Sequence, residues 1–382
     1  MKKSVQSELD KFFGRIERSD TNKHIVTQSA FSQARAKLMH TAFIEMDSLQ
    51  TGLFYRDNDY KTWYGFRLAA IDGSGLRLPA NAETIKAFGL HSVLKNGQKK
   101  VMARISEAFD PLNHITLDAA ICPFTTSEHT MMLGHLDKLG PGDLAIYDRN
   151  YPGFWIYKTH QARGIEFCMR VQKKGRGKFI EDFVESGEDQ AIVEVHCRTR
   201  EAAKKCGELG LDTEPVKCRL VRVELHTGET EVLITSLLDM DVFRHEGFKA
   251  LYHMRWPVEE DYKFLKCRLE LANFSGKSVE AVYQDFFAKI FMANLISILA
   301  FDSNIEIGHK TEHRKLAYKI NWTNALGNME KTGALLFIRD NYKELLAELH
   351  ILFMVEPVSF RPGRTYARHM SWKSRHFSMC YK

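Results

Sequence analysis

Two short apolar segments that each run into an aspartate constrain the fold of this chain more than any other feature. Residues 65–74 predict a strand with Asp72 at its end, and residues 143–151 predict a buried strand that stops at Asp148. The elements predicted between and after these two strands are strands 101–109 and 114–122, their turn 110–113, helices 127–139 and 153–162, and strand 165–171. This alternation of strands and helices is typical of an α/β core.

The pattern changes after the last of these strands. A charged, glycine-bearing stretch over 172–190 is typical of a boundary loop. Three alternating segments then predict strands at 191–200, 218–225 and 231–238. This block is therefore predicted to be a mainly antiparallel β insertion. Helices resume at Val242, and further helical patterns cover 4–55 and 312–353.

The cysteines and the apolar segments indicate the cellular compartment in which the protein functions. The seven cysteines are scattered and form no Cys-x-x-Cys pair, so neither a zinc site nor a disulfide framework is predicted. The first residues lack the apolar region of a signal peptide. The longest apolar run, 286–301, is interrupted by Lys289 and Asn294, so no membrane span is predicted. We expect a reduced, cytoplasmic protein that does not contact a membrane.

The positive charge of the chain is concentrated at its end. The segment Pro357–Lys382 carries four arginines, two lysines and no acidic residue, which equals the whole formal net charge of +6. A basic terminus that also holds aromatic residues suits a nucleic-acid contact, and a solvated tail without a partner is the alternative. The helical N-terminal region is a second candidate DNA-contacting module, with a plain helical cap as its alternative; its basic residues include Arg15, Arg18, Lys23, Arg35 and Lys37.

Residues 252–266 predict a helix with an unusual charged face. Steps of three, four, four and three residues place one acid and its cationic neighbours on this face, which comprises Tyr252, Arg255, Glu259, Lys263 and Lys266. Such a face suits a carboxylate that holds a metal while cations hold phosphates, although ordinary ion pairs of an amphipathic helix are equally open. Pro257 either kinks the helix or marks its start at Trp256, and the second case would leave Tyr252 and Arg255 outside it.

Two strand-end acids and one acid on a later helix match the needs of a two-metal phosphodiester site. Side chains at the ends of neighbouring strands escape the core and can converge on one crevice. Mg²⁺ prefers oxygen ligands and borrows some of them from the substrate phosphate. Asp72, central in the sheet, is expected to bridge both ions, and Asp148 and Glu259 to complete one ion each. A simple turn or cap remains the alternative role for either aspartate.

The same residues resemble a known family. The spacing Tyr252-x2-Arg255-x3-Glu259-x6-Lys266 resembles the signature of the cut-and-paste DDE transposases of bacterial insertion sequences. Other blocks resemble, in order, that family's N-terminal helical motif, its first-acid and second-acid strands and the segment after its third acid: 31–38, 71–74, 147–151 and 269–277.

The resemblance implies an α/β fold with an RNase H-like mixed-sheet catalytic core. The β insertion would interrupt this core, and helical regions would precede and follow it. The predicted parts are an N-terminal helical DNA-end-binding region (1–60), the first part of the core (61–171), the β-rich insertion (172–240), the second part of the core with the third acid (241–305), and a C-terminal helical region with the basic tail (306–382).

The resemblance also implies roles for individual residues. The implied catalytic residues and metal ligands are Asp72, Asp148 and Glu259, for two Mg²⁺ ions that Mn²⁺ would replace. The implied DNA-binding residues are Tyr252, Arg255 and Lys266, with Lys263 on the same face and Arg149 beside the second acid. A structural ion pair is the alternative for Arg149.

Three functions are consistent with these patterns. The first is a DNA transposase that cuts the ends of its insertion sequence, frees 3′-hydroxyls and joins them to target DNA, as a homodimer that holds two ends together. The second is an RNase H-like nuclease that cuts without joining. The third is a catalytically decayed DNA-binding repressor of transposition. A strand-transfer product separates the first from the second, and metal-dependent cleavage excludes the third.

Overall fold

The computed structural model describes residues 4–17, 24–175, 177–224 and 229–359. The basic tail predicted from residue 357 therefore lies almost wholly outside the described residues, as do Arg18 and Lys23. The chain forms two compact units, each built from separated segments. Unit 1 comprises Met1–Asn58, Leu76–Met102 and Leu265–Lys382, and unit 2 comprises Asp59–Gly75 and Ala103–Phe264.

The strands form one nine-stranded sheet with the order β2-β3-β1-β5-β6-β9-β8-β7, to which β4 is added by pairing with β3. Their bounds are β1 Arg67–Leu78, β2 Leu90–Val93, β3 Lys99–Asp110, β4 Ile115–Pro123, β5 Asp143–Tyr147, β6 Glu166–Val171, β7 Gln190–Val195, β8 Val216–Glu224 and β9 Thr230–Thr235. The β1–β5 and β5–β6 pairs are parallel, whereas β6–β9, β8–β9, β7–β8, β3–β4 and β2–β3 are antiparallel. The predicted α/β class with a mixed sheet is confirmed.

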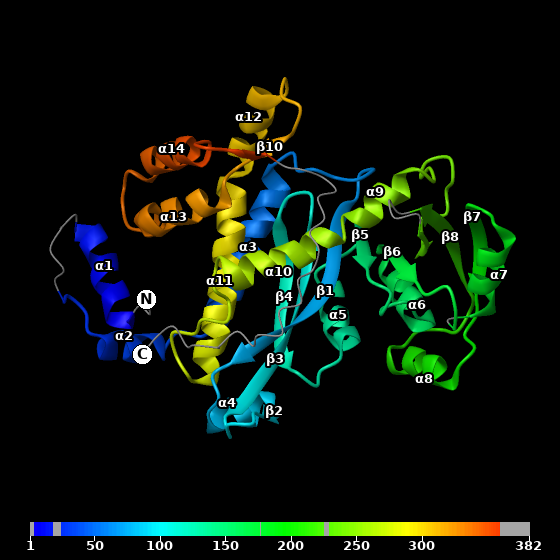
Figure 1. Ribbon diagram of the computed structural model, residues 1–382, viewed down its shortest axis with the longest axis horizontal. Helices are drawn as coiled ribbons and strands as arrows, with labels where there is room; N and C mark the ends of the chain where they lie inside the picture. The colour runs from blue at the N-terminus through cyan, green and yellow to red at the C-terminus, as the bar shows by residue number, and fades with distance from the viewer. Residues whose placement is uncertain (1–3, 18–23, 176, 225–228, 360–382) are drawn as a thin grey trace. The chain divides into compact units, whose positions relative to one another are not determined.

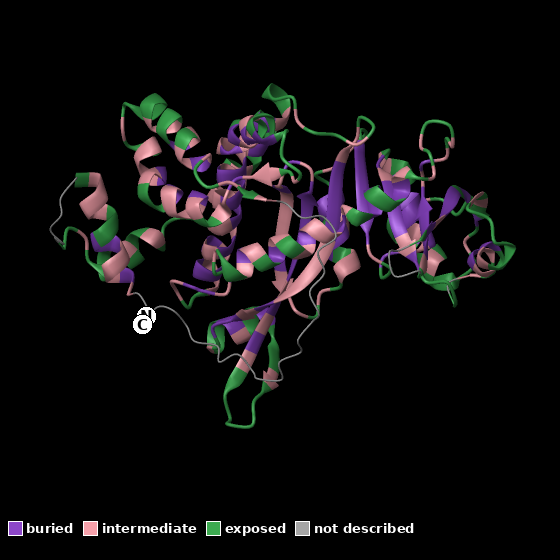
Figure 2. Cartoon of the chain, turned by 45° about the horizontal axis from the view of Figure 1, so that its top comes forward, coloured by how far each residue is buried: buried purple, intermediate pink, exposed green. Residues whose placement is uncertain are grey.

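The central strands of unit 2 are buried on both faces (Figure 2). Alternate residues of β5 belong to different cores, because successive side chains in a strand point to opposite faces. Ala145 and Tyr147 pack with helices α5 (Glu128–Leu136), α6 (Phe154–Arg163), α7 (Lys178–Ser186) and α8 (Arg200–Glu208). Leu144 and Ile146 pack instead with α9 (Gly247–His253). This second face is the one that leads to the candidate site.

The block over 172–240 differs in detail from its prediction. Its strands β7, β8 and β9 do pair antiparallel, and β9 joins them to β6, so they extend the central sheet (Figure 1). The stretch predicted as a boundary loop contains α7, and the strand predicted over 191–200 ends at Val195 before α8 begins. Ile180 and Phe183 explain the first helix, since both are buried in the unit 2 core.

Unit 1 is mainly helical. Its helices are α1 Val5–Glu17, α2 Gln28–Arg35, α3 Thr41–Asp57, α4 Ala82–Phe88, α11 Val279–Leu299, α12 Phe301–Thr311, α13 Trp322–Thr332 and α14 Tyr342–Phe353, with a 3₁₀ turn at Gly333–Phe337 and short strands β10 (Tyr318–Lys319) and β11 (Val358–Ser359). Helix α3 runs along α11 (Figure 1), and a hydrophobic cluster joins the end of α11 to α12, α13 and α14. Helix α10 (Trp256–Cys267) begins in unit 2 and ends in unit 1.

Helix α11 is long and apolar, as the pattern over 279–301 predicts. It is the one described helix that could cross a membrane by length and composition, which corrects the prediction that no segment is long enough. Its polar residues nevertheless have partners inside unit 1: Asn294 donates to Asp47 at 3.0 Å, and Gln50 donates to the carbonyl of Phe291 at 2.9 Å. This packing is that of a core helix.

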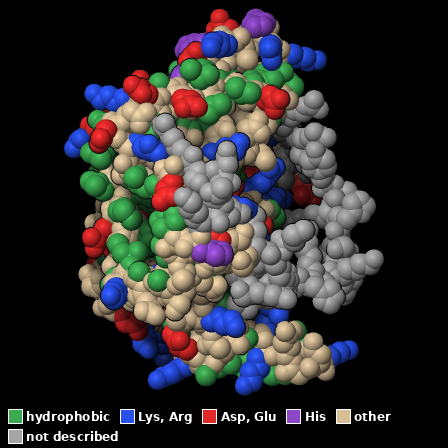
Figure 3. All heavy atoms as spheres, turned by 90° about the vertical axis from the view of Figure 1, so that its left-hand side faces the viewer, with side chains coloured by type: hydrophobic (Ala, Val, Ile, Leu, Met, Phe, Trp, Pro, Cys, Tyr) green, Lys and Arg blue, Asp and Glu red, His purple; other side chains and the backbone are tan. Residues whose placement is uncertain are grey.

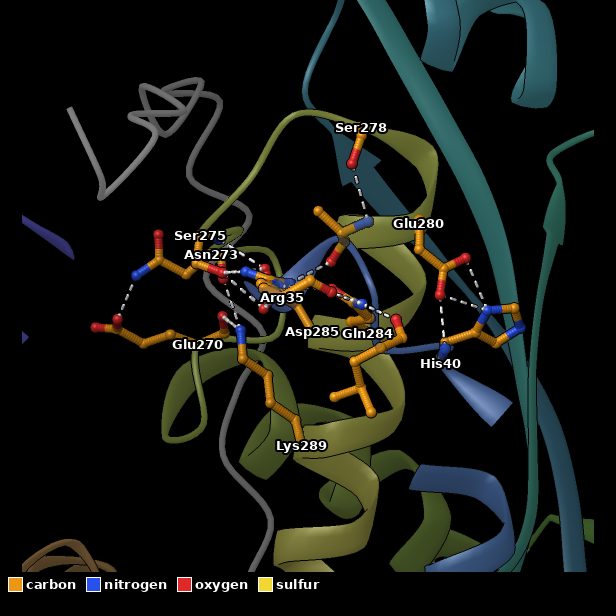
Figure 4. Close-up of polar contacts among 12 residues, drawn as sticks. Arg35, His40, Glu270, Asn273, Ser275, Ser278, Glu280, Gln284, Asp285 and Lys289 are labelled. Carbon is orange, nitrogen blue, oxygen red and sulfur yellow. Dashed lines mark hydrogen bonds and ion pairs between the residues drawn. The ribbon is translucent and has the colours of Figure 1, made fainter. Parts of the chain in front are cut away.

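A buried polar network connects two of the blocks that the family resemblance singled out (Figure 4). Arg35, from the block 31–38, donates to Gln284 at 2.6 Å and to Asp285 at 2.9 Å, and also to Ser275 in the block 269–277. Its side chain is only 15% exposed. Nearby, His40 contacts Glu280 at 3.0 Å. The Arg35 side chain is therefore held by hydrogen bonds within unit 1. At this position, the structure favours a plain helical cap over a DNA-contacting residue.

Figure 3 views the molecule from the side on which α13 and α14 lie in Figure 1. Hydrophobic side chains lie there between basic and acidic ones, and the visible charges are mixed in sign. In the same unit, Arg15 of α1 pairs with Glu330 of α13 at 3.0 Å. A surface of mixed charge is typical of a solvated face.

Candidate active site

Asp72 and Asp148 occupy matching positions on neighbouring parallel strands. The last register pair of β1 and β5 is Ile71 with Tyr147; Asp72 is the next residue of β1, and Asp148 directly follows the end of β5. Parallel neighbours lie about 4.8 Å apart, so the two aspartates leave the pair side by side. Both continue the alternating series that faces α9, which includes Leu144 on β5. The prediction that Asp72 ends its strand is wrong, because β1 continues to Leu78; it is the partner strand β5 that stops.

The backbone at Asp72 is fixed from two sides. Its carbonyl oxygen accepts hydrogen bonds from the hydroxyl of Ser106 on β3 at 3.0 Å and from the hydroxyl of Tyr262 on α10 at 2.8 Å. Ser106 is held in turn by His135, whose other ring nitrogen lies 2.6 Å from Asp118. Helix α10 is thereby attached to the strand at the position of the first acid.

A pair of buried carboxyls makes a second attachment of α10. The carboxyl of Asp261 interacts with that of Glu107 on β3, and the side chain of Glu107 is fully buried. Burial raises the pKa of Asp261, which favours the protonated form of this carboxyl. Asp261 faces the sheet, and its neighbour Glu260 is exposed. Neither lies on the side of the helix that carries Glu259.

Glu259 stands in the first turn of α10 and forms an ion pair. Its carboxylate accepts from Arg255 at 2.9 Å, and the exposed side-chain fractions are 29% for the acid and 7% for the arginine. The guanidinium also lies over the ring of Trp256, 4.8 Å from its centroid. A charge-assisted hydrogen bond of this kind fixes the carboxylate before any substrate arrives.

The acids influence one another electrostatically. Burial raises the pKa of Asp72 to about 6, and the negative charges of Glu259 and Glu128 act in the same direction, while the Gly73 amide and the Arg255 guanidinium oppose them. The Asp72 carboxylate thus lies in a partly buried region with two acidic neighbours. A group with this environment is a functional-site candidate on physical grounds.

The helix predicted to carry all the charged residues on one face is divided in two. Helix α9 ends at His253 and α10 starts at Trp256, with Pro257 in its first turn, where a missing amide hydrogen costs least. Tyr252 therefore belongs to α9 and Arg255 to the connection, so the one-face prediction holds only from Glu259 onward. The side chains of Tyr252 and Arg255 are buried, at 2% and 6% exposure.

The remaining predicted DNA-binding residues lie in different environments. Lys263 is exposed on α10, and Arg149 is exposed beside the second acid without an ion pair to any residue that the structure describes. The alternative of a structural ion pair for Arg149 is thus not realised there. Lys266 lies in the part of α10 that belongs to unit 1. Their contacts with DNA stay predictions.

Comparison with known proteins identifies the family. The family described as "Transposase DDE domain" matches residues 63–295, which is more than half of the 382 residues. The chain belongs to this transposase family. It is 24% identical over 277 residues to the transposase InsG of insertion sequence element IS4 from Escherichia coli strain K12. That match covers 72% of this chain and 61% of the relative, so the chain matches less than two thirds of the length of InsG.

A solved structure is also similar to this member of the transposase family. It is the synaptic complex of piggyBac transposase with hairpin DNA, with 12% sequence identity and a TM-score of 0.40. The similarity covers 73% of this chain and 57% of that chain.

The carboxylates of this transposase-family site fit a divalent cation in kind. No group of three or more His, Cys, Asp or Glu side chains within the described ranges is arranged to hold a metal ion by itself. Mg²⁺, however, is commonly bound by one or two carboxylates, several waters and substrate phosphate oxygens. Asp72 and Asp148 supply oxygen donors of the right type at one edge of the sheet, and a bound phosphate would have to supply others.

Sequence reasoning missed several residues that shape the site. Ser106 and Tyr262 fix the backbone of Asp72, and Glu128 and Tyr151 approach it from α5 and from the turn after β5. Tyr151 was signalled only as part of the second-acid block. Tyr262 was signalled only as an apolar docking position of the helix predicted over 252–266. Ser106 and Glu128 carry no local pattern, because strand pairing and helix docking bring them to Asp72 from distant parts of the chain.

Proposed function

We propose that the chain is a DNA transposase. It would bind the ends of its insertion sequence, hydrolyse phosphodiester bonds to free 3′-hydroxyls, and join these to target DNA. Membership of the transposase family supports this activity. The observation that carries the proposal is the matched position of Asp72 and Asp148 just beyond the β1–β5 register, with the Glu259 helix attached to the same strand.

In this proposal unit 2 contains an RNase H-like core, with the β7–β9 block as its insertion. The parallel strands β1 and β5 present the first two acids, and α10 presents the third. When bound, two Mg²⁺ ions, or Mn²⁺ in their place, would activate the attacking oxygen and stabilise the leaving oxygen. Asp72 would bridge both sites, and Asp148 and Glu259 would each serve one.

The protein groups around the acids would perform the other parts of the reaction. Arg255 holds Glu259 in the free protein and, being a fixed cation in a partly buried place, would exchange part of this contact for a phosphate oxygen. Its Nε and the hydroxyl of Tyr252 are buried without hydrogen-bond partners among the described residues, so both donors remain available to a phosphate. Exposed Arg149 and Lys263 would add longer-range attraction for DNA.

The remaining parts of the proposal concern partners and location. We propose that the chain acts on double-stranded DNA as a homodimer that holds two element ends, in the bacterial cytoplasm and away from the membrane. A nuclease that cuts without joining and a decayed repressor are the competing functions. The nuclease would use the same three acids, so only a joined product separates it from the transposase, whereas metal-dependent cleavage would exclude the repressor.

The test uses the purified full chain, Mg²⁺ and a labelled duplex that carries the element's own end and flanking DNA. We expect a cleaved and then a joined product with the natural chain and neither product with Glu259→Ala. Glu260→Ala is the matched control, since this exposed neighbour should leave both products unchanged. Cleavage without joining would favour the nuclease, and DNA binding without any metal-dependent product would favour the repressor.

A further inference from the structure

Glu128 lies directly against the strand that carries the first acid. It is the first residue of α5, after the cap Ser127. Its Cγ is 3.0 Å and its Oε1 3.3 Å from the place where a Cβ on Gly73 would lie, so this close approach depends on the missing side chain of the glycine. Gly73 faces the opposite side of β1 from Asp72. The Glu128 carboxylate therefore lies beside the backbone of β1 at the position next to Asp72, and its negative charge contributes to the raised pKa of the Asp72 carboxyl.

The carboxylate of Glu128 is held, but only in part. Arg104 of β3 donates to Oε1 at 2.8 Å, and the guanidinium also lies over Phe124, 5.1 Å from the ring centroid. The other oxygen of Glu128 accepts no hydrogen bond from the described residues. A carboxylate has about four lone-pair sites, so this group retains acceptor capacity beside Asp72.

The hydroxyl of Tyr151 is the second, independent observation. The side chain is 1% exposed, yet its hydroxyl has no hydrogen-bond partner among the described residues. The neighbouring Tyr147, whose ring centroid is 4.9 Å away, uses its hydroxyl in a 2.9 Å hydrogen bond to His160. A buried hydroxyl without a hydrogen-bond partner is rare in proteins. At a candidate site it points to a ligand, or to a hydrogen bond that forms when the site is occupied.

The surroundings of the Tyr151 hydroxyl are acidic. Burial raises its pKa well above the ordinary value, and the charges of Glu128, Asp72 and Asp148 raise it further. The phenol therefore keeps its proton and can serve as a donor to a carboxylate. The ring centroids of His129, the residue after Glu128, and Tyr151 lie 5.6 Å apart, and Nε2 of His129 lies 3.1 Å from the carbonyl oxygen of Asn150. These contacts hold the start of α5 against the turn that follows β5.

We propose that Glu128 is a fourth carboxylate of the candidate site and that the Tyr151 hydroxyl is the positioning donor that holds it. With a hydrogen bond from Tyr151, Glu128 would accept hydrogen bonds from waters on a divalent cation held by Asp72 and Asp148. Outer carboxylates of this kind orient the ligands and the waters of a metal. The inference rests on the proposed function, because it deepens the same site.

The experiment compares Glu128→Gln, Tyr151→Phe and Tyr147→Phe in the full chain. Mn²⁺ binding is followed by electron paramagnetic resonance of the free ion in the presence of an element-end duplex, whose phosphates can complete the site, with the duplex alone as the blank. Thermal unfolding is followed in EDTA. We expect Glu128→Gln to weaken Mn²⁺ binding about tenfold and Tyr151→Phe a few-fold, in line with the usual cost of losing outer-sphere partners. Tyr151→Phe should leave Tm unchanged or raised, because it removes a hydroxyl without a partner. Tyr147→Phe should lower Tm and leave Mn²⁺ affinity unchanged.

Each part of the proposal can fail separately. Natural Mn²⁺ affinity in Glu128→Gln would overturn the fourth carboxylate, and a fall in Tm of Tyr151→Phe equal to that of Tyr147→Phe would overturn the positioning role. Failure of the proposed function has a different signature: the natural chain would form no cleaved or joined DNA, whatever the variants do to Mn²⁺ affinity. Weakened Mn²⁺ binding in Glu128→Gln would support the fourth carboxylate even then.

Discussion

The hydroxyl of Tyr262 donates a 2.8 Å hydrogen bond to the carbonyl oxygen of Asp72. This bond links the helix of the third acid to the strand of the first at the backbone, so the Asp72 carboxylate remains available for other ligands. Burial of Tyr262, at 5% exposure, protects the bond from competition with water. The hydrogen bond that holds α10 against β1 thus uses none of the three acidic side chains Asp72, Asp148 and Glu259.

The raised pKa of Asp72 predicts a stability gain when its charge is removed. Because the pKa in the folded chain is about 6 and the ordinary value is 3.8, the stabilising contribution of this group is present below pH 4 and is lost as the pH rises through 6. Asp72→Asn should therefore raise the free energy of unfolding at pH 7.5 by up to about 3 kcal/mol, and by little at pH 4. Urea unfolding in EDTA at both values measures this. An equal effect at the two pH values would contradict the prediction.

The Arg255–Glu259 ion pair predicts that the third acid matters for stability as well as for chemistry. Glu259→Ala leaves a buried guanidinium without its partner, which should cost about 1–3 kcal/mol. The exposed neighbour offers the control, and Glu260→Ala should change stability by less than about 0.5 kcal/mol. Thermal unfolding of the two variants provides the comparison. Equal Tm values would mean that the ion pair contributes nothing measurable.

The network around Arg35 predicts a structural role for a residue in an otherwise basic segment. Arg35→Ala should destabilise unit 1 by about 2–4 kcal/mol, because it leaves buried acceptors on Gln284 and Asp285 without their donor. Lys37→Ala, two residues away and exposed, should be nearly neutral. Chemical denaturation monitored by tryptophan fluorescence tests both. If Arg35→Ala weakened DNA binding and left the unfolding midpoint unchanged, the DNA-contacting reading of this residue would be restored.

The basic tail predicts a salt-dependent share of DNA affinity. Truncation after Ser359 removes four arginines and two lysines and keeps the β10–β11 pair intact. Each lost phosphate contact should reduce the slope of log K against log salt by about 0.9. Fluorescence anisotropy with an element-end duplex at several salt concentrations measures the slope. A slope equal to that of the full chain would show that the tail makes no phosphate contact.

The sequence was most informative about elements that depend on residues close together along the chain. The β1 and β5 strands, their aspartates and the hairpin at 110–113 follow from apolar runs and turn residues, and the structure contains them. The sequence was least informative about which polar side chains are buried. The helical spacing predicts Arg255 as a surface cation, yet the predicted helix is divided near Pro257, and the Arg255 side chain is buried beside Trp256. Glu128 gave no signal at all, since only the pairing of β3, β1 and β5 brings α5 to the first acid.

The Arg35–Asp285 contact joins residues that are 250 positions apart, and this has a consequence during synthesis of the chain. At about 5–20 residues per second, a ribosome needs roughly 12–50 s to add the partner after Arg35 has been made. Unit 2 ends at Phe264, so all of its segments have been synthesised before Asp285 exists. We therefore expect the unit with the acids to fold first on the ribosome, while helices α2 and α3 wait for α11 to emerge.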